Sequence, residues 1–376
     1  MRRVLATATA VLLVVAACSS EANDTTTAPP SSTATTAPDV PTTTAASTTT
    51  EAPATTEASA TTTTKAPAEG TLGDPVPPGT WARIGAVDAV VLAFIPNATD
   101  LVLAENEFND SPAPGNRFVI WRVAVANAGE VATPLLSELS FSVVGPSAVA
   151  YDSSAYCGVI PDEFDQFRDV FPGGTVEGNL CWEVAEDDAD DLLLLIDEFG
   201  FSSDRVVFAA AGTDVPLDVE YPTPVAPTPD GQIGSRGNPH PLGTPVPVGE
   251  WDITVTGAID DATTEVLAEN SFNEAPADGR QFAIVGIEAT YRGGESDILF
   301  ASTSFNVVGP RAVSYTGEDA CGVVPEELDA FSEVFPGGTI AGNLCWSVMS
   351  GDIDGLVFYS QESFTIDGEP AFFGLG

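Results

Sequence analysis

The sequence predicts an all-β protein made of two tandem antiparallel β-sandwich domains, each with one short helix, after a disordered stalk. Three observations lead to this prediction. One long pattern occurs twice, short runs of alternating apolar and polar residues recur in both copies, and the residues before the first copy carry few large apolar side chains. Each copy has about 140 residues, the size of one ordinary domain.

The repeat consists of motifs that return in a constant register from Leu103 to Val184. These motifs are Leu103–Asn109 and Leu267–Asn273, Phe141–Pro146 and Phe305–Pro310, Phe171–Gly174 and Phe335–Gly338, and Gly178–Trp182 and Gly342–Trp346. Self-similarity over this length indicates duplication of a whole domain rather than a solenoid of short units. Near the start, the first copy has a longer stretch between Trp81 and Asn106 than the second has between Trp251 and Asn270. We therefore expect a hairpin loop that differs between the copies.

The strands are indicated by apolar and polar residues that alternate with a period of two. Trp251–Thr256 and Arg280–Tyr291 show this alternation and are rich in β-branched and aromatic residues. Ser304–Val308, Thr339–Val348 and Leu356–Tyr359 add shorter runs. Glycine and proline separate the runs at the spacing that is typical of a sandwich.

One helix per copy is expected before a Pro-Gly-Gly stop. Pro161–Val170 has proline in the first turn and acids beside it, and Phe164, Phe167 and Phe171 would share one face. Leu328, Phe331 and Phe335 repeat this spacing in the second copy.

The N-terminus has the features of an export signal. Arg2 and Arg3 precede an apolar stretch that is too short to span a bilayer, and this stretch ends in Val15–Cys18. That tetrapeptide resembles the bacterial lipobox, so residues 1–17 are interpreted as a lipoprotein signal peptide and Cys18 as the lipidated residue. The alternative is an ordinary signal peptide with a cysteine near its cleavage site. The interpretation predicts a lipid-anchored protein on the extracytoplasmic face of the cell membrane.

Composition defines the other boundaries. Residues 18–70 are mostly Thr, Ala, Ser, Pro and Glu, and such a segment cannot bury enough apolar surface to fold, which predicts a disordered stalk. The first domain is assigned to residues 71–220 and the second to residues 236–376. Alternating prolines between Tyr221 and Pro229 make residues 221–235 a semi-rigid linker.

Four cysteines remain after Cys18, an even number in an exported protein, and therefore predict disulfides. Each copy has one cysteine before the expected helix and one after it, so the simplest bridges are Cys157–Cys181 and Cys321–Cys345. The alternative is a metal site, for which two cysteines without further ligands are a poor set. The tryptophans after Cys181 and Cys345 face the other side of the strand, where we expect them to pack against the neighbouring layer.

The repeated motifs resemble those of a known domain family. The motifs are Asn238–Pro239 and Gly243–Val246 before Trp251, then Asn270–Asn273, Phe335–Gly338 and Gly342–Trp346. They resemble immunoglobulin-like domains of Gram-positive and actinobacterial lipoproteins, which are classed as a domain of unknown function and look related to a secreted mycobacterial immunoprotective antigen. The resemblance covers about residues 73–211 and 237–375. It implies an immunoglobulin-like sandwich and no catalytic residues.

Charge and histidine content exclude several functional classes. The net charge of −43 makes binding to nucleic acid or to anionic lipid implausible, because both require a basic surface. The single histidine, His240, lies between prolines and has no counterpart in the first copy. No nucleophile–histidine pair or phosphate-binding loop is evident.

Clustered acids form the first candidate site. Asp188 and Asp190 lie in the acidic run Glu186–Asp191, and Asp352 and Asp354 take their places in the second copy. Clustered carboxylates are ligands of calcium, so these four aspartates are a candidate calcium site and calcium is the only cofactor considered. The alternative is an exposed turn before a strand, since the spacing of a calcium loop is missing.

Asparagines form the second candidate site. Asn106 and Asn109, with Asn270 and Asn273, lie in segments punctuated by proline and glycine. They either contact a ligand or hydrogen-bond the backbone of a structural turn.

These observations favour a non-enzymatic binding or interaction module with an unknown envelope or extracellular partner. The alternatives are a structural surface spacer and a calcium-dependent module. An enzyme that uses a pair of carboxylates is the least favoured hypothesis.

Overall fold

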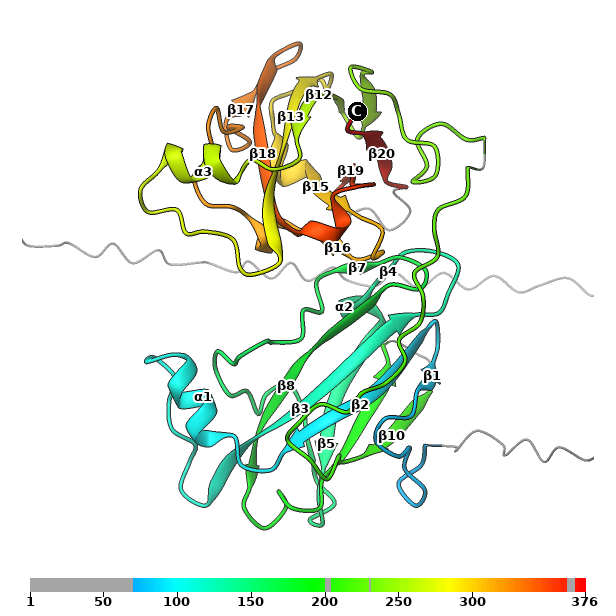
Figure 1. The fold of residues 1–376 in the computed structure, drawn as a ribbon, viewed down its shortest axis with the longest axis vertical. Coiled ribbons are helices and arrows are strands. Elements are labelled where there is room, and N and C mark those ends of the chain that lie inside the picture. Colours follow the sequence, from blue (N-terminus) through cyan, green and yellow to red (C-terminus); the bar gives the residue numbers. More distant parts are fainter. Residues whose placement is uncertain (1–69, 200–203, 230, 364–368) are drawn as a thin grey trace, which may run out of the picture. The chain divides into compact units, whose positions relative to one another are not determined.

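The computed structural model describes residues 70–199, 204–229, 231–363 and 369–376. The predicted signal peptide, Cys18 and almost all of the predicted stalk lie outside this range. In the described residues, no helix is both long and apolar enough to cross a membrane. The described chain contains two repeats of one all-β fold, which confirms the predicted fold class (Figure 1).

The first repeat contains two four-stranded antiparallel sheets. One has the spatial order β1 (Ala82–Ile84), β2 (Val87–Ile95), β3 (Asn116–Asn127) and β8 (Thr175–Ala185). The other has the order β10 (Arg205–Ala209), β9 (Leu193–Glu198), β5 (Leu139–Val144) and β6 (Ala150–Tyr151). The remaining elements are the pair β4 (Thr133–Pro134) and β7 (Asp169–Val170) and the helices α1 (Thr99–Glu105) and α2 (Leu135–Glu138).

The second repeat has the same topology. One sheet has the order β11 (Val246–Val248), β12 (Trp251–Ile259), β13 (Arg280–Tyr291) and β18 (Thr339–Met349). The other has the order β16 (Ser314–Tyr315), β15 (Thr303–Val308), β19 (Val357–Glu362) and β20 (Ala371–Gly374). The remaining elements are β14 (Asp297–Ile298), β17 (Glu333–Val334), α3 (Thr263–Glu269), α4 (Leu299–Ser302) and the 3₁₀ turns η1 (Gly317–Asp319) and η2 (Ser350–Asp352).

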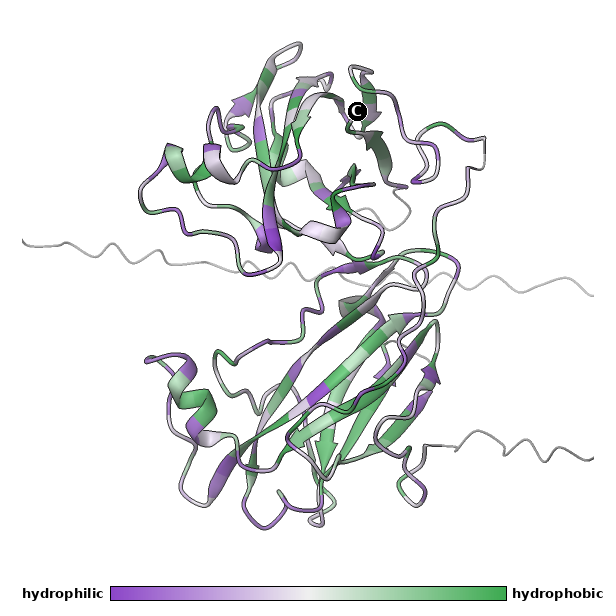
Figure 2. Ribbon diagram, viewed as in Figure 1, coloured by the Kyte–Doolittle hydropathy of each residue, from purple (hydrophilic) through white to green (hydrophobic). Residues whose placement is uncertain are grey.

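The strands lie where the alternating patterns predicted them, and their inward side chains form the core of each sandwich. Trp121 of β3 and Leu194 of β9 are completely buried and belong to one cluster that joins the two sheets of the first repeat. Hydrophobic residues follow the strands, while hydrophilic ones gather in the turns (Figure 2). Trp182 and Trp346 are buried in the two cores, as expected from their positions after the cysteines.

The expected difference between the first hairpins is not found. Ile84 pairs with Val87 across a turn that contains Gly85, and Val248 pairs with Trp251 across a turn that contains Gly249. Both glycines have positive φ, +54° and +56°, as such tight turns require. The counterpart of Trp251 is therefore Val87, whereas Trp81 lies before β1. Trp81 and Trp251 are therefore not equivalent residues, and their comparison suggested a difference in length that does not exist. The constant register of the repeat extends through the first hairpin.

The helix expected at Pro161–Val170 and its counterpart with Leu328 and Phe331 in the second copy are also absent. Asp162 has φ +46°, which interrupts a right-handed helix, and the following backbone turns to the edge of β8, where the N–H of Phe164 donates to the carbonyl oxygen of Asn179 at 2.9 Å. Phe164 is buried, but Phe167 is 63% exposed, so these side chains do not share one face. Among the described residues, the longest helix is instead α1 in the first repeat and α3 in the second.

Candidate functional site

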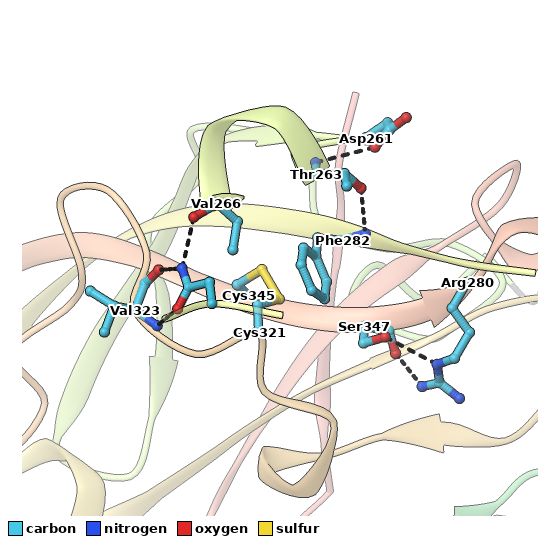
Figure 3. The surroundings of a disulfide bond; sticks show 10 residues. Asp261, Thr263, Val266, Arg280, Phe282, Cys321, Val323, Cys345 and Ser347 are labelled. Atoms are coloured by element: carbon cyan, nitrogen blue, oxygen red, sulfur yellow. Dashed lines mark hydrogen bonds between the residues drawn. A yellow bond between two sulfur atoms is a disulfide. The ribbon is translucent and has the colours of Figure 1, made fainter. Parts of the chain in front are cut away.

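The predicted disulfides are confirmed. Cys157 bonds Cys181 and Cys321 bonds Cys345, with Cα–Cα separations of 5.9 and 5.7 Å. Each bridge joins the loop that contains Cys157 or Cys321, which we call the cysteine loop, to the middle of β8 or β18. The bonded cysteine of the strand lies on the face opposite the tryptophan that follows it. In the first repeat the bridge packs under α1. Figure 3 shows the second bridge, with Val266 of α3 and Val323 of the cysteine loop near it.

Asn109 and Asn273 act within the fold. The amide nitrogen of Asn109 donates to the carbonyl oxygens of Val102 and Val159, each at 2.7 Å, and its amide oxygen accepts from the N–H of Val159 at 2.9 Å. Asn273 repeats all three contacts with Val266 and Val323. Each asparagine therefore links α1 or α3 to the cysteine loop by hydrogen bonds. These contacts agree with the hypothesis that the asparagine side chains bond the backbone.

Asn106 and Asn270 shape the turn that precedes this contact. Their side-chain oxygens accept from the N–H of Phe108 and of Phe272 at 2.9 and 3.0 Å. The turn projects each phenylalanine into solvent, where Phe108 is 85% exposed and Phe272 is 90% exposed. Two exposed apolar side chains thus occupy equivalent places in the two repeats.

The four aspartates of the candidate calcium site do not converge. Asp188 is buried, and its carboxylate accepts from the N–H and hydroxyl of Ser147 and from the hydroxyl of Tyr151, at 2.8, 2.6 and 2.7 Å. These bonds outweigh burial and lower its pKa. Asp190 instead forms an ion pair with Arg117 at the surface.

The second repeat has the same arrangement. Asp352 is buried and accepts from the N–H of Arg311 and the hydroxyl of Tyr315, whereas Asp354 is exposed. Within the described ranges, no group of three or more His, Cys, Asp or Glu side chains is placed to hold a metal ion. Neither acidic pair forms the predicted ligand set, because one aspartate of each pair is used to anchor the turn that follows β5 or β15.

A groove occupies the same position in both repeats, and sequence reasoning did not identify it. In the first repeat it has a volume of about 540 Å³ and lies between β5 and β8; in the second it has a volume of about 440 Å³ and lies between β15 and β18. We call these the β5 groove and the β15 groove. Their equivalent lining residues include Phe141 and Phe305, Glu163 and Glu327, Phe164 and Leu328, Asn179 and Asn343, and Trp182 and Trp346.

The repeated Gly-Asn-Leu-Cys-Trp motif builds one wall of each groove. A Cβ atom on Gly178 would lie 2.4 Å from the Cα atom of Phe164, so only glycine lets the cysteine loop approach β8 this closely. The side chain of Asn179 donates to the carbonyl oxygen of Pro161 at 2.7 Å, and its backbone bonds Asp162 and Phe164. The motif therefore fixes the loop that carries Glu163.

The lining of each groove combines apolar and uncharged polar residues, and its only described charges are acidic. The charged lining residues are Asp152 and Glu163 in the β5 groove and Glu327 in the β15 groove; no Lys, Arg or His is among the described residues of either lining. Burial, and secondarily the nearby Asp165 carboxylate, raises the pKa of Glu163 above its usual range. An apolar ligand that carries positive charge would complement both features.

The rims of the grooves differ. Tyr156 and Phe199 lie at the β5 groove, and Ala320 and Ser363 take their places in the second repeat. The β15 groove has a different aromatic pair, formed by Phe300 and Phe331, whose ring centroids are 4.4 Å apart. Both of these rings are mostly exposed. The two grooves therefore share a floor and have different borders.

Part of the first repeat is similar to a domain family of unknown function. Residues 79–206, which span β1 to β9 and the start of β10, match a family model described as a domain of unknown function (DUF4352). No curated protein matches the chain. A 2.2 Å crystal structure of a conserved hypothetical protein from Bacillus anthracis is 16% identical over 36% of this chain and 95% of that chain, with a TM-score of 0.24. The chain thus carries a domain that is similar to a family whose function is unknown.

Proposed function

We propose that this protein is a cell-envelope lipoprotein, anchored through Cys18, which displays two immunoglobulin-like modules for non-enzymatic binding outside the cytoplasmic membrane. The observation that carries the binding role is the groove that both repeats keep at the same place. Two equivalent sites on one chain allow bivalent attachment, which raises the effective affinity for a partner with repeated or clustered binding segments.

The carboxylates favour binding over hydrolysis. Asp152 and Glu163 both line the β5 groove, but Thr316 takes the place of Asp152 in the second repeat. A carboxylate pair is therefore absent from the described lining of the β15 groove, although Phe305, Glu327 and Trp346 keep the places of Phe141, Glu163 and Trp182. A duplicated catalytic site would need both acids in each copy.

The anchor is tested by cell fractionation of the Cys18→Ala variant, with Ser19→Ala as the matched control. Lipidation at Cys18 predicts that the wild type and Ser19→Ala stay with the membrane and that Cys18→Ala is lost from it. Membrane retention of Cys18→Ala would contradict the proposed anchor.

The binding role is tested by sedimentation of residues 19–376 with envelopes from cells that lack the protein. Ser140→Trp and Ser304→Trp place a large ring on the lining of each groove, at positions that are exposed or half-buried. We expect sedimentation of the wild type and its loss in the double variant, with unchanged circular dichroism. Equal sedimentation of both would favour the spacer function.

A further inference from the structure

Strand β5 has a free edge inside the β5 groove. The N–H of Phe199 donates to the carbonyl oxygen of Glu138. Because hydrogen-bonded pairs alternate in an antiparallel ladder, the backbone N–H and C=O of even-numbered residues of β5 face β9, and those of odd-numbered residues face the other edge. At that edge the N–H of Leu139 donates to Leu135, and Val143 pairs with Tyr151 of β6. Phe141 lies between these two positions.

The edge at Phe141 has no neighbouring strand in the described structure. The β6 ladder covers only Val143 and Val144. After Tyr151 the chain turns away at Asp152, whose carboxylate accepts from the N–H and hydroxyl of Ser154. The backbone N–H and C=O of Phe141 therefore face the edge of β5 that is away from β9, and Phe141 is one of the residues that line the groove.

The second repeat has the same free edge. The N–H of Ser363 donates to the carbonyl oxygen of Ser302. By the same alternation, the backbone N–H and C=O of Phe305 face away from β19. The β16 ladder pairs only with Val307 and Val308, so it does not reach Phe305. Duplication has thus kept an unpaired strand edge beside an apolar groove.

These edges lack the usual features that prevent strand pairing. Edge strands are ordinarily protected by lysine, proline, a bulge or a covering segment. The sequences Leu139–Ser142 and Thr303–Asn306 contain no charge and no proline. By contrast, β8 is covered at Asn179, whose N–H donates to the carbonyl oxygen of Asp162 and whose carbonyl oxygen accepts from the N–H of Phe164.

We propose that each groove binds an extended, lysine- or arginine-bearing apolar segment of a partner protein, which adds as a short strand to the free edge of β5 or β15. The inference rests on the proposed binding function and specifies its ligand. Strand addition provides main-chain hydrogen bonds, while alternate side chains enter the groove. Each edge offers the backbone N–H and C=O of one unpaired residue, Phe141 or Phe305, so one guest residue pairs with it while the flanking guest residues lie along the groove.

Charge selects the guest. Glu163 and Glu327 occupy equivalent places on the lining, and no basic residue is on the described lining of either groove, so a basic side chain on the guest completes an ion pair in each groove. A second copy of this chain is a poor guest, because 55 acids against 12 bases cause mutual repulsion.

The test uses residues 19–376 and a fluorescent probe peptide, acetyl-Lys-Val-Lys-Val-Lys-Val-amide, in an anisotropy titration. We expect saturable binding of two peptides per chain. Glu163→Gln with Glu327→Gln should weaken binding about threefold to tenfold, the effect of losing a partly exposed charge-assisted contact. Glu105→Gln with Glu269→Gln is the matched control, because these acids lie on α1 and α3 and line neither groove.

Two probe variants separate strand addition from simple charge attraction. A peptide that is N-methylated at every lysine and valine keeps its charge and loses all the backbone N–H groups that could pair with the strand edge, so strand addition predicts loss of binding. A peptide with glutamate in place of lysine should not bind. Equal binding of the N-methylated probe, or no effect of the Glu163→Gln and Glu327→Gln changes, overturns the proposal.

The outcomes also distinguish this inference from the proposed function. If the chain sediments with envelopes through its grooves but no lysine–valine peptide binds, the binding function holds and the peptide ligand is wrong. Competition of envelope binding by soluble cell-wall glycan, with no competition by the peptide, would also overturn the inference. Failure of both experiments rejects the binding function itself.

Discussion

The hydroxyl of Tyr151 donates a hydrogen bond to the carboxylate of Asp188 at 2.7 Å, across 37 residues of sequence. Tyr315 and Asp352 make the same contact in the second repeat. Gly145 permits this approach, since a Cβ atom there would lie 2.6 Å from the Cβ atom of Asp188. An acid that looks like part of a charged surface run is therefore a structural anchor.

Replacement of this anchor should destabilise the first repeat. Asp188→Asn removes an ionised acceptor that serves three donors, and we expect a loss of about 1–3 kcal/mol in the free energy of unfolding. Urea denaturation at pH 7 measures the change. Exposed Asp187→Asn, its neighbour, should change stability by less than about 0.5 kcal/mol. Calcium should not stabilise the wild type through Asp188, whereas calcium stabilisation that disappears in Asp188→Asn would restore the metal hypothesis.

The same carboxylate predicts a pH dependence. Hydrogen bonds from Ser147 and Tyr151 lower the pKa of Asp188 in the folded state. Its contribution to stability is therefore present above the ordinary aspartate pKa of about 3.9 and is lost as the pH falls through the lowered folded value. Thermal unfolding between pH 2 and 5 should show a shallower slope in Asp188→Asn than in the wild type. An identical slope in both proteins would contradict this role.

The glycine of the repeated motif should be intolerant of a methyl group. In Gly178→Ala the new Cβ atom meets the backbone of Phe164 at 2.4 Å, so the cysteine loop must move away from β8. We expect a loss of about 1–3 kcal/mol, as for overpacking elsewhere. Gly212→Ala, which meets no atom within 4 Å, is the control. Equal melting temperatures of the two variants would refute the close approach.

Each disulfide should stabilise its own repeat. The bridges close loops over a sequence separation of 24, for which chain entropy predicts about 3–4 kcal/mol. Cys157→Ala with Cys181→Ala should lower the unfolding transition of the first repeat and leave that of the second. Calorimetry with the corresponding Cys321→Ala and Cys345→Ala pair should give the reverse pattern. A single unfolding transition that shifts equally in both variants would contradict independent stabilisation.

The projecting phenylalanines should contribute little to stability. Phe108 and Phe272 are 85% and 90% exposed, so Phe108→Ser and Phe272→Ser should each change the free energy of unfolding by less than about 0.5 kcal/mol. The buried neighbour Val102 provides the contrast, since Val102→Ala should cost about 1–3 kcal/mol. Destabilisation by Phe108→Ser equal to that of Val102→Ala would show that this ring packs in solution.

The sequence by itself determined the strands, the duplication and the disulfide pairing. Alternation along Arg280–Tyr291 specifies a strand because side chains of a half-buried strand must alternate between core and solvent. The cysteine positions sufficed for the pairing because each repeat contains one candidate pair. These features depend on residues close together in sequence or on the repeat itself.

Only the tertiary structure decided where the acids, the expected helix and the grooves lie. The spacing of Phe164 and Phe167 suits a helix, but hydrogen bonds to β8 and the positive φ of Asp162 produce a loop instead. Phe141 and Trp182 line one groove because two sheets bring their strands together across 41 residues of sequence (182 − 141). Long-range packing sets such positions, and local spacing carries no information about them.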